Sequence, residues 1–575
     1  MLKPCLVALP LLAVLAGFEA HAASPANPTA ASARMDRDLM EASVQKLHSL
    51  YAAHRYSVTE VVRWHLARIH RYNNVYQPVE TLFESEALEE AGRQDAEIAS
   101  GTPPRGLLWG VPIVIKANTS IKGTVTTDGW LGYSSKGHEL IASKDATVVA
   151  KLRAAGAILI GHTNMPDFAN SDTNRSSSFG RTGNAYDIRF SPGGSSGGTV
   201  TAVTANMAVL GTGTDTGNSI RMPAATSAVV GIFPTRGLVS TAGIAPLDWL
   251  LDNTGPIARS VTDAAIGLAV MAGPDPLDAR TADAASRLEP NGYLHYLKAD
   301  SLKGKRFGVP AFLLHGTGIP FHGVPAAVPD AVAAERSADI ETAIPLEPET
   351  RAAFLRAIEE LKAAGATVVF DESIMPDAFA KTATRVATYA YVREGTDNFL
   401  REFGPTPYRS IDDYAKAVPA APSAGSVNGE EESSAVFGNI KIKQTLLESD
   451  PDAETNYFGP RRRTLEAYLE PLARLHLDGY VYPAIQMPPV DETMPQYGKL
   501  SGGPHSATDW VNMIGVPAIV VVGPFYPSGL PFGLEFSGRP WDDGALLGYA
   551  YAYEKATHHR HPPVLVERGL LPTAK

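Results

Sequence analysis

The chain has 575 residues, of which 44% are hydrophobic and 19% charged, with a formal net charge of −11 at pH 7. This composition is typical of a folded globular protein and excludes a fibrous or largely disordered chain. The acidic balance argues against nucleic acid or an anionic membrane as a partner, because both attract basic surfaces.

The N-terminus resembles a secretory signal. Lys3 precedes an apolar run over residues 5–18, and Ala-His-Ala at 20–22 fits a cleavage site. The run is too short for a comfortable membrane span, and no later segment is long and apolar enough for one. The sequence therefore predicts a signal peptide over 1–22, a linker over 23–35 and a secreted or periplasmic protein. An apolar core helix at the start of the domain is the alternative.

The remainder of the chain alternates between helical and strand-like patterns. We expect helices or strands, in chain order, at 36–54 (helix), 58–72 (helix), 85–98 (helix), 110–117 (strand), 146–155 (helix), 157–164 (strand), 202–210 (a small-residue helix or buried segment), 305–312 (strand), 349–364 (helix), 366–372 (strand), 479–485 (strand), 517–523 (strand) and 546–556 (helix). Such alternation favours an α/β fold: a single large domain over 36–575 with a mixed central β-sheet covered by helices on both faces. The stretches 314–328 and 418–428 are candidate insertions or lids.

Two glycine-rich runs enclose three serines. Residues 191–198 read SPGGSSGG and residues 211–221 read GTGTDTGNSIR. Such runs bind phosphate, relieve close packing or expose a nucleophile. No P-loop motif is present, which disfavours nucleotide binding. Gly-Gly-Ser-Ser-Gly also fits the nucleophile elbow of an α/β-hydrolase around Ser195, which would require an aspartate and a histidine later in the chain.

A fourth interpretation explains much more of the sequence. GGSSGG and GTDTGNSIRMPAA resemble the motifs of the amidase signature family, and further stretches in the same order resemble that family as well. These are GVPIVIKAN (110–118), AAGAILIGHTNMPDFA (154–169), DNTGPIARSVTDA (252–264) and the closing region 515–554. The resemblance extends from about residue 40 to about residue 560.

The resemblance implies a Ser–cis-Ser–Lys triad, in which Ser219 is the nucleophile, Ser195 is the bridging serine after a cis peptide bond, and Lys116 is the base. It also implies an oxyanion hole made by the backbone N–H groups of Thr216, Gly217, Asn218 and Ser219. A serine hydroxyl needs an adjacent base to become a good nucleophile. A lysine is that base only when neutral, and burial at the end of the apolar stretch before Lys116 lowers its pKa in the required direction.

Two charged residues are expected to support the nucleophile loop, and two positions differ from the usual family pattern. We expect Asp215 and Arg221 to pair and brace the nucleophile loop. Many family members carry Asp directly after the lysine, where this chain has Ala117, and Gly before the nucleophile, where it has Asn218. No metal or other cofactor is expected, because the proposed chemistry needs none and the only cysteine, Cys5, lies in the predicted signal.

The sequence thus predicts an amidase that hydrolyses the C–N bond of a small-molecule amide through an acyl-enzyme. The alternatives are an α/β-hydrolase-type serine esterase and an inactive binding protein of the same fold. The export signal disfavours a role in an amidotransferase complex. Residues 314–328 and four apolar side chains line an acyl pocket or belong to the core: Met165, Leu247, Trp249 and Leu250.

Overall fold

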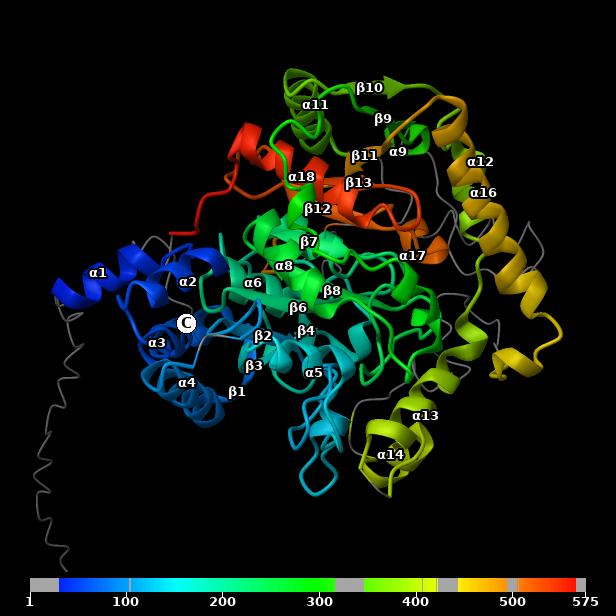
Figure 1. Ribbon diagram of the computed structural model, residues 1–575. Helices are drawn as coiled ribbons and strands as arrows, with labels where there is room; N and C mark the ends of the chain where they lie inside the picture. The colour runs from blue at the N-terminus through cyan, green and yellow to red at the C-terminus, as the bar shows by residue number, and fades with distance from the viewer. Residues whose placement is uncertain are drawn as a thin grey trace, which may run out of the picture. The chain divides into compact units, whose positions relative to one another are not determined.

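The computed structural model describes residues 30–102, 105–315, 346–405, 407–419, 421, 443–493, 504 and 506–564. The chain divides into two compact units, residues 1–40 and 41–575. In the first unit, the described part is helix α1 (Ala30–Leu39). The second unit holds the sheet (Figure 1). All of the predicted site residues also belong to the second unit. The segment predicted as a signal peptide, 1–22, lies outside the described residues, as do most of the candidate insertions 314–328 and 418–428.

Within the described residues of the second unit, eleven strands form one mixed sheet in the order β1-β3-β2-β6-β8-β7-β12-β13-β11-β9-β10. The strands are β1 (Val79–Leu82), β2 (Pro112–Lys116), β3 (Ile158–Thr163), β6 (Leu210–Asp215), β7 (Val230–Phe233), β8 (Asn253–Ala258), β9 (Arg306–Val309), β10 (Thr367–Phe370), β11 (Gly479–Pro483), β12 (Ala518–Val522) and β13 (Gly533–Ser537). A separate two-stranded sheet pairs β4 (Arg175–Ser176) with β5 (Gly180–Arg181). This arrangement confirms the predicted mixed α/β fold.

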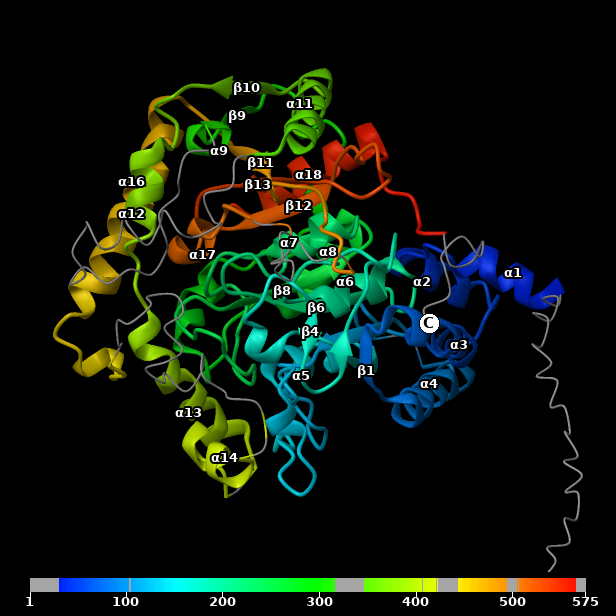
Figure 2. The ribbon, with the colours of Figure 1, turned by 180° about the vertical axis from the view of Figure 1, so that it is seen from behind.

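The α-helices in the described part of the second unit surround this sheet. They are α2 (Val44–Ala52), α3 (Val58–Tyr76), α4 (Glu84–Ala99), α5 (Thr147–Ala154), α6 (Gly197–Thr204), α7 (Arg221–Thr226), α8 (Val261–Met271), α9 (Ala311–His315), α11 (Pro348–Ala363), α12 (Asp377–Ala383), α13 (Val392–Phe403), α14 (Ile411–Ala417), α16 (Gly459–Arg474), α17 (Trp510–Ile514) and α18 (Asp543–Thr557). Figures 1 and 2 show α4 beside β3 near one edge of the sheet and α11 beside β10 at the other.

Central strand β6 shows how helices cover both faces. Side chains alternate between the two faces of a strand. The Leu210 side chain lies 4.0 Å from where a Cβ at Gly267 of α8 would be. A Cβ added at the next residue, Gly211, would instead lie 2.7 Å from the Thr199 side chain of α6. The two helices therefore pack on opposite faces, and the missing side chain at Gly211 allows α6 to approach closely.

The N-terminal helices differ in part from the sequence prediction. The single helix expected over 36–54 is interrupted, and its second part, α2, begins after Ser43, whose hydroxyl accepts a hydrogen bond from the Lys46 N–H at 3.1 Å. Helix α3 begins after Ser57, as predicted, and Ser57 and Glu60 form a complete capping box. Polar caps thus determine where these helices begin.

The topology places two functional segments at one edge of the sheet. Strands β2 and β6 are parallel neighbours, with Ile113 opposite Leu210. Parallel neighbours end at the same edge, so Lys116 at the end of β2 lies beside the loop that follows Asp215 at the end of β6. This is the edge at which open α/β sheets place their sites.

Candidate active site

Lys116 is fully buried and its side-chain amine points at a serine pair. Its Nζ donates to Ser195 Oγ at 2.7 Å and to Ser196 Oγ at 3.1 Å. A third hydrogen bond runs to Thr214 Oγ1 at 2.8 Å. The lysine and the predicted bridging serine are therefore in direct contact although 79 residues separate them in the sequence.

The surroundings of Lys116 favour its neutral form. Burial lowers the pKa of the amine to about 7, against the smaller opposing influence of Asp128, Asp215 and Asp252. A desolvated amine without an ion-pair partner loses the hydration that stabilises its charge. A substantial fraction of Lys116 is therefore unprotonated near neutral pH, which is the state that a general base needs.

The turn that carries Ser195 is tightly enclosed. The Gly194–Ser195 peptide bond is cis, as the family resemblance implies. A Cβ added at Gly194 would lie 2.4 Å from the carbonyl oxygen of Ser171. The Ser196 N–H donates to the carbonyl oxygen of Ser219 at 3.2 Å, which places the predicted nucleophile beside this turn. The glycines here serve close packing, one of the alternatives that the sequence left open.

The loop after β6 contains consecutive backbone N–H groups that have no acceptor among the described residues. None of the backbone N–H groups of residues 216–219 donates a hydrogen bond to another described residue. Ser219 is 6% exposed and Asn218 is 8% exposed, so the loop lies just beneath the surface. Four adjacent unpaired donors next to a serine form an arrangement suited to a developing negative oxygen. They coincide with the predicted oxyanion-hole residues Thr216, Gly217, Asn218 and Ser219.

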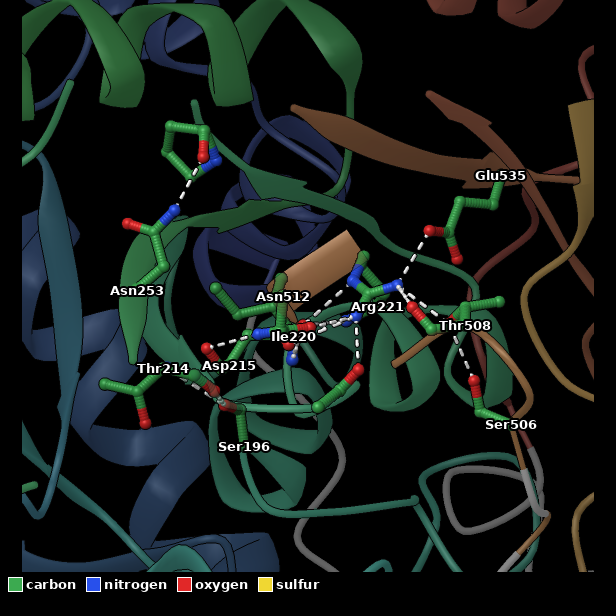
Figure 3. Close-up of polar contacts among 12 residues, drawn as sticks. Ser196, Thr214, Asp215, Ile220, Arg221, Asn253, Ser506, Thr508, Asn512 and Glu535 are labelled. Atoms are coloured by element: carbon green, nitrogen blue, oxygen red, sulfur yellow. Dashed lines mark hydrogen bonds and ion pairs between the residues drawn. The ribbon is translucent and has the colours of Figure 1, made fainter. Parts of the chain in front are cut away.

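Arg221 ties this loop to the rest of the core (Figure 3). Its Nε donates to Asp215 Oδ2 at 3.1 Å, and its Nη1 lies 2.9 Å from Glu535 Oε1 on β13. A further guanidinium contact reaches the carbonyl oxygen of Gly217 inside the loop. All three charged side chains are fully buried. The pair expected between Asp215 and Arg221 is present, and Glu535 adds a second carboxylate.

Distant residues complete the network. Arg221 also donates to Thr508 Oγ1 at 2.7 Å and to Asn512 Oδ1 at 2.6 Å, and Asn512 Nδ2 donates to the carbonyl oxygen of Asp215 at 2.8 Å (Figure 3). Asn512 belongs to α17, about 300 residues further along the chain. Sequence reasoning missed these partners, because no local pattern marks a residue that acts across such a separation.

Two further acids lie against the loop. Asp252 accepts a hydrogen bond from Thr216 Oγ1 at 2.5 Å. Asp172 interacts with the Asn218 side chain, and burial raises the pKa of Asp172 to about 7. Asn218, which departs from the family pattern, therefore has a polar partner that a glycine would not reach.

The candidate pocket residues separate into two groups. Met165 and Leu247 pack with Ala117 next to the lysine. Trp249 donates through Nε1 to the carbonyl oxygen of Tyr391, and Leu250 belongs to a different core cluster. Most of the predicted lid 314–328 lies outside the described residues. In the part of the chain that the structure describes, no group of three or more histidine, cysteine, aspartate or glutamate side chains is placed to hold a metal ion.

Comparison with known proteins identifies the family. The family model for amidases matches residues 60–334 and 337–547, which together make up most of the chain. The chain belongs to the amidase family. This membership replaces the α/β-hydrolase interpretation of the GGSSG motif, in which a histidine would be the base.

Curated relatives and solved structures agree with this assignment. The chain is 33% identical to one subunit of the glutamyl-tRNA(Gln) amidotransferase of Symbiobacterium thermophilum, over 92% of this chain and 99% of the relative. It is 32% identical to the same subunit of the Moorella thermoacetica enzyme, over 87% of this chain and 93% of the relative. The peptide amidase of Stenotrophomonas maltophilia superposes with a TM-score of 0.71 and 28% identity, covering 91% of this chain and 98% of the amidase.

These relatives overturn the predicted location and partners. Their name describes one subunit of an enzyme that acts on a glutamyl-tRNA. The predictions of a signal peptide and of a secreted or periplasmic protein are therefore wrong. The predicted partners, a small-molecule amide without nucleic acid, are corrected as well, because they leave out the protein partners that the name of these relatives indicates. The first prediction relied on a short apolar run and a three-residue cleavage pattern, which carry little information. The prediction of partners relied on a net charge averaged over every surface, which carries no information about protein partners.

The helices in the described ranges are not built to cross a bilayer. None of them combines the length and the apolar character that a membrane crossing requires.

Proposed function

We propose that this protein hydrolyses the C–N bond of an amide through an acyl-enzyme on Ser219. Lys116, when neutral, takes the proton of the Ser195 hydroxyl, and Ser195 takes the proton of Ser219 as its Oγ attacks the carbonyl carbon. The N–H groups of 216–219 stabilise the oxyanion. The proton returns through Ser195 to the leaving nitrogen, so that ammonia or an amine departs. Water then hydrolyses the ester and regenerates Ser219.

The observation that carries this proposal is the contact between Ser195 and the amine of the fully buried Lys116, whose pKa is lowered by burial to about 7. The Nζ–Oγ distance of 2.7 Å is within the range for proton transfer. Lys116 has no ion-pair partner among the described residues that would hold it charged. In our proposal the catalytic domain extends over 36–575, somewhat beyond the matched residues.

Three single variants test the proposal: Ser219→Ala, Ser195→Ala and Lys116→Met. Each should lower amide hydrolysis by at least about three orders of magnitude, because members of a catalytic unit fail together. The substrates to screen are peptide C-terminal amides, aryl amides and glutamine, with ammonia or amine release as the readout. Wild-type turnover by Ser219→Ala would refute the nucleophile. A purified wild-type chain that turns over no amide would instead favour an inactive binding protein.

A second candidate is the amide-hydrolysing subunit of an amidotransferase. The 33% identity over nearly the whole length of the relative favours it. The same chemistry would then release ammonia from glutamine for a partner protein. Glutamine turnover that rises when the chain is co-expressed with the other components of such an enzyme would support this role. Efficient turnover of peptide or aryl amides by the chain alone, with none of glutamine, would count against it.

A further inference from the structure

A buried asparagine contacts the nucleophile loop from a helix far along the chain. Asn512 of α17 is fully buried and has no role in the mechanism above. Its Nδ2 donates to the carbonyl oxygen of Asp215 at 2.8 Å, and its Oδ1 accepts from the Arg221 guanidinium at 2.6 Å (Figure 3). A backbone carbonyl only accepts and a guanidinium only donates, so these partners fix which end of the amide faces which. Both ends of the amide are therefore used on this loop.

The backbone of Asn512 is itself held in place. The Arg236 guanidinium contacts the Asn512 carbonyl oxygen and donates to the carbonyl oxygen of Leu251 at 2.8 Å. The Arg236 N–H also donates to the carbonyl oxygen of Gly515, directly after α17, at 3.1 Å. The Asn512 side chain therefore projects toward the nucleophile loop from an anchored position.

The contact with Asp215 lies where the strand pairing stops. Asp215 is the last residue of β6 and the last that pairs with β8, opposite Asn253. The peptide bonds over residues 215–219 are trans. In a trans peptide group the C=O and N–H bonds point in opposite directions. Because Asn512 holds the Asp215 carbonyl, the Thr216 N–H points away from Asn512.

The next carbonyl on the same side is held in the same way. Arg221 contacts the carbonyl oxygen of Gly217, so the Asn218 N–H points away from Arg221. Arg221 and Asn512 are hydrogen-bonded to each other and so lie on one side of the loop. The N–H groups of Thr216 and Asn218 therefore both face the opposite side.

The preceding residue shows what lies on that opposite side. The Thr214 carbonyl oxygen accepts from Ser196 Oγ at 3.2 Å and from Lys116 Nζ at 3.4 Å. The Asp215 carbonyl, held by α17, points the other way. The Thr216 N–H is antiparallel to that carbonyl and so faces the side of the base and the serine pair. The aim of this donor thus follows from the hydrogen bond to the Asp215 carbonyl.

We propose that Asn512 is a positioning residue of the oxyanion hole. It holds the Asp215 carbonyl so that the Thr216 N–H is aimed, before a substrate binds, at the oxygen that becomes negative when Ser219 attacks. This inference rests on the proposed function, in which that oxyanion forms. A donor that is already aimed needs no reorganisation during the reaction, so its aim affects the rate more than the binding of the amide.

Two variants test the proposal. Asn512→Ala removes the amide without adding a charge, and Asn512→Asp keeps an acceptor for Arg221 but lacks the donor to Asp215. In both, kcat for amide hydrolysis should fall by about a hundredfold, as on loss of one oxyanion donor, while KM stays within about threefold of wild type. An unchanged kcat in a folded Asn512→Ala variant overturns the proposal. A loss confined to Asn512→Asp assigns the effect to the added charge and also overturns it.

A second readout separates aiming from general packing. The probe is a trifluoromethyl ketone analogue of the amide that the wild-type chain hydrolyses fastest, which adds to Ser219 and places an oxyanion in the hole. Its inhibition constant should rise by about the same factor as kcat falls, whereas that of the corresponding alcohol, which forms no oxyanion, should not change. Equal weakening of both compounds would indicate a structural role only and would overturn the proposal.

Asn184 provides the matched control. It is also fully buried, its Nδ2 donates to the carbonyl oxygen of Thr226 at 2.8 Å, and its Oδ1 accepts from the Tyr186 N–H at 2.9 Å. Asn184→Ala therefore removes the same kind of bonds away from residues 215–219, and the ratio of the two inhibition constants should stay at the wild-type value. A ratio that changes equally in Asn184→Ala and Asn512→Ala would overturn the proposal.

Ser219→Ala distinguishes failure of this inference from failure of the proposed function. If Ser219→Ala retains hydrolysis, the proposed function fails, whatever the Asn512 variants do. If it is inactive while Asn512→Ala keeps the wild-type kcat and ketone affinity, only the inference about Asn512 fails. Should the Asn512 variants not fold, a crystal structure of the wild-type ketone adduct answers the question. Its oxyanion should lie about 3 Å from the Thr216 nitrogen, with Asn512 still on the Asp215 carbonyl, and an adduct without either contact overturns the proposal.

Discussion

Replacing Arg221 by methionine removes the cation that two buried carboxylates share. Asp215 and Glu535 lie 3.1 and 2.9 Å from the guanidinium, and all three side chains are fully buried. Breaking a buried ion pair by deleting one partner costs about 3–5 kcal/mol, because the remaining charge has no counter-ion. Asp215 keeps the N–H of Ile220 at 2.9 Å, which offsets part of the loss. We expect the free energy of unfolding to fall by about 3–5 kcal/mol at pH 8.

The stability that Arg221→Met loses should increase with pH. Burial raises the pKa of Glu535 to about 7 even with Arg221 beside it, and removing the arginine raises it further. A carboxyl group whose folded pKa lies above its unfolded value destabilises the protein increasingly as pH rises through that interval. Arg221→Met should therefore lose less stability at pH 6 than at pH 8.

Urea unfolding at both pH values measures this, with Arg153→Met as the control. Arg153 lies 3.2 Å from Asp145, but its side chain is 47% exposed, so its loss should cost under about 1 kcal/mol. A change of less than about 1 kcal/mol for Arg221→Met at pH 8 would refute the claim that this arginine holds the loop together.

Three further predictions concern other parts of the fold. Burial raises the pKa of Glu41, but the nearby Arg560 outweighs burial and holds that pKa at about 2. The ion pair should therefore stabilise the protein above about pH 4.5 and lose this effect as the pH falls toward 2. In urea unfolding, the free energies of unfolding of wild type and Glu41→Gln should become equal at that low pH. Gly198→Ala should prevent stable folding, because the new Cβ would lie 2.3 Å from a backbone carbonyl oxygen. Gly92→Ala on α4 is the control, since a Cβ there has no other atom within 4 Å, and it should raise the free energy of unfolding by about 0.5–1 kcal/mol. Asn218→Ala should keep kcat within about tenfold of wild type, because its backbone N–H remains.

Each of these has a contrary outcome. A constant difference between wild type and Glu41→Gln from pH 7 to pH 2 would show that the ion pair does not titrate as described. Equal stability of the two alanine variants would mean that the close packing around α6 is not limiting. A loss of several hundredfold in Asn218→Ala would assign its side chain a direct role in the reaction.

The sequence predicts the apolar strands well and the glycine-rich ones poorly. β2 and β12 are runs rich in β-branched residues and β3 begins with the apolar stretch Ile-Leu-Ile, and the structure has all three strands at the expected places. The segment 202–210 is expected to be a small-residue helix or a buried segment, and it is buried throughout. The sequence does not show that α6 ends at Thr204 and that β6 begins at Leu210. β6 reads LGTGTD, so its strand character is hidden by glycines that exist because α6 and the nucleophile loop approach too closely for side chains.

In the candidate site, too, some residues are predictable from the sequence and others are not. Lys116, Ser195 and Ser219 were found through family motifs, and no rule of spacing would have joined them. Glu535 sits in a strand where a charge is unexpected, and that mismatch is the one signal that could have marked it.

The proposed catalysis depends on an uncharged Lys116 that activates Ser219 through Ser195, and covalent labelling tests this most directly. A fluorophosphonate probe, followed by peptide mapping, should modify Ser219 in the wild-type chain. The labelling rate should rise with pH through about 7, as Lys116 loses its proton. In Lys116→Met the rate should be lower by orders of magnitude and should no longer show that inflection. Modification of a different residue, or equal rates in both proteins, would contradict this mechanism.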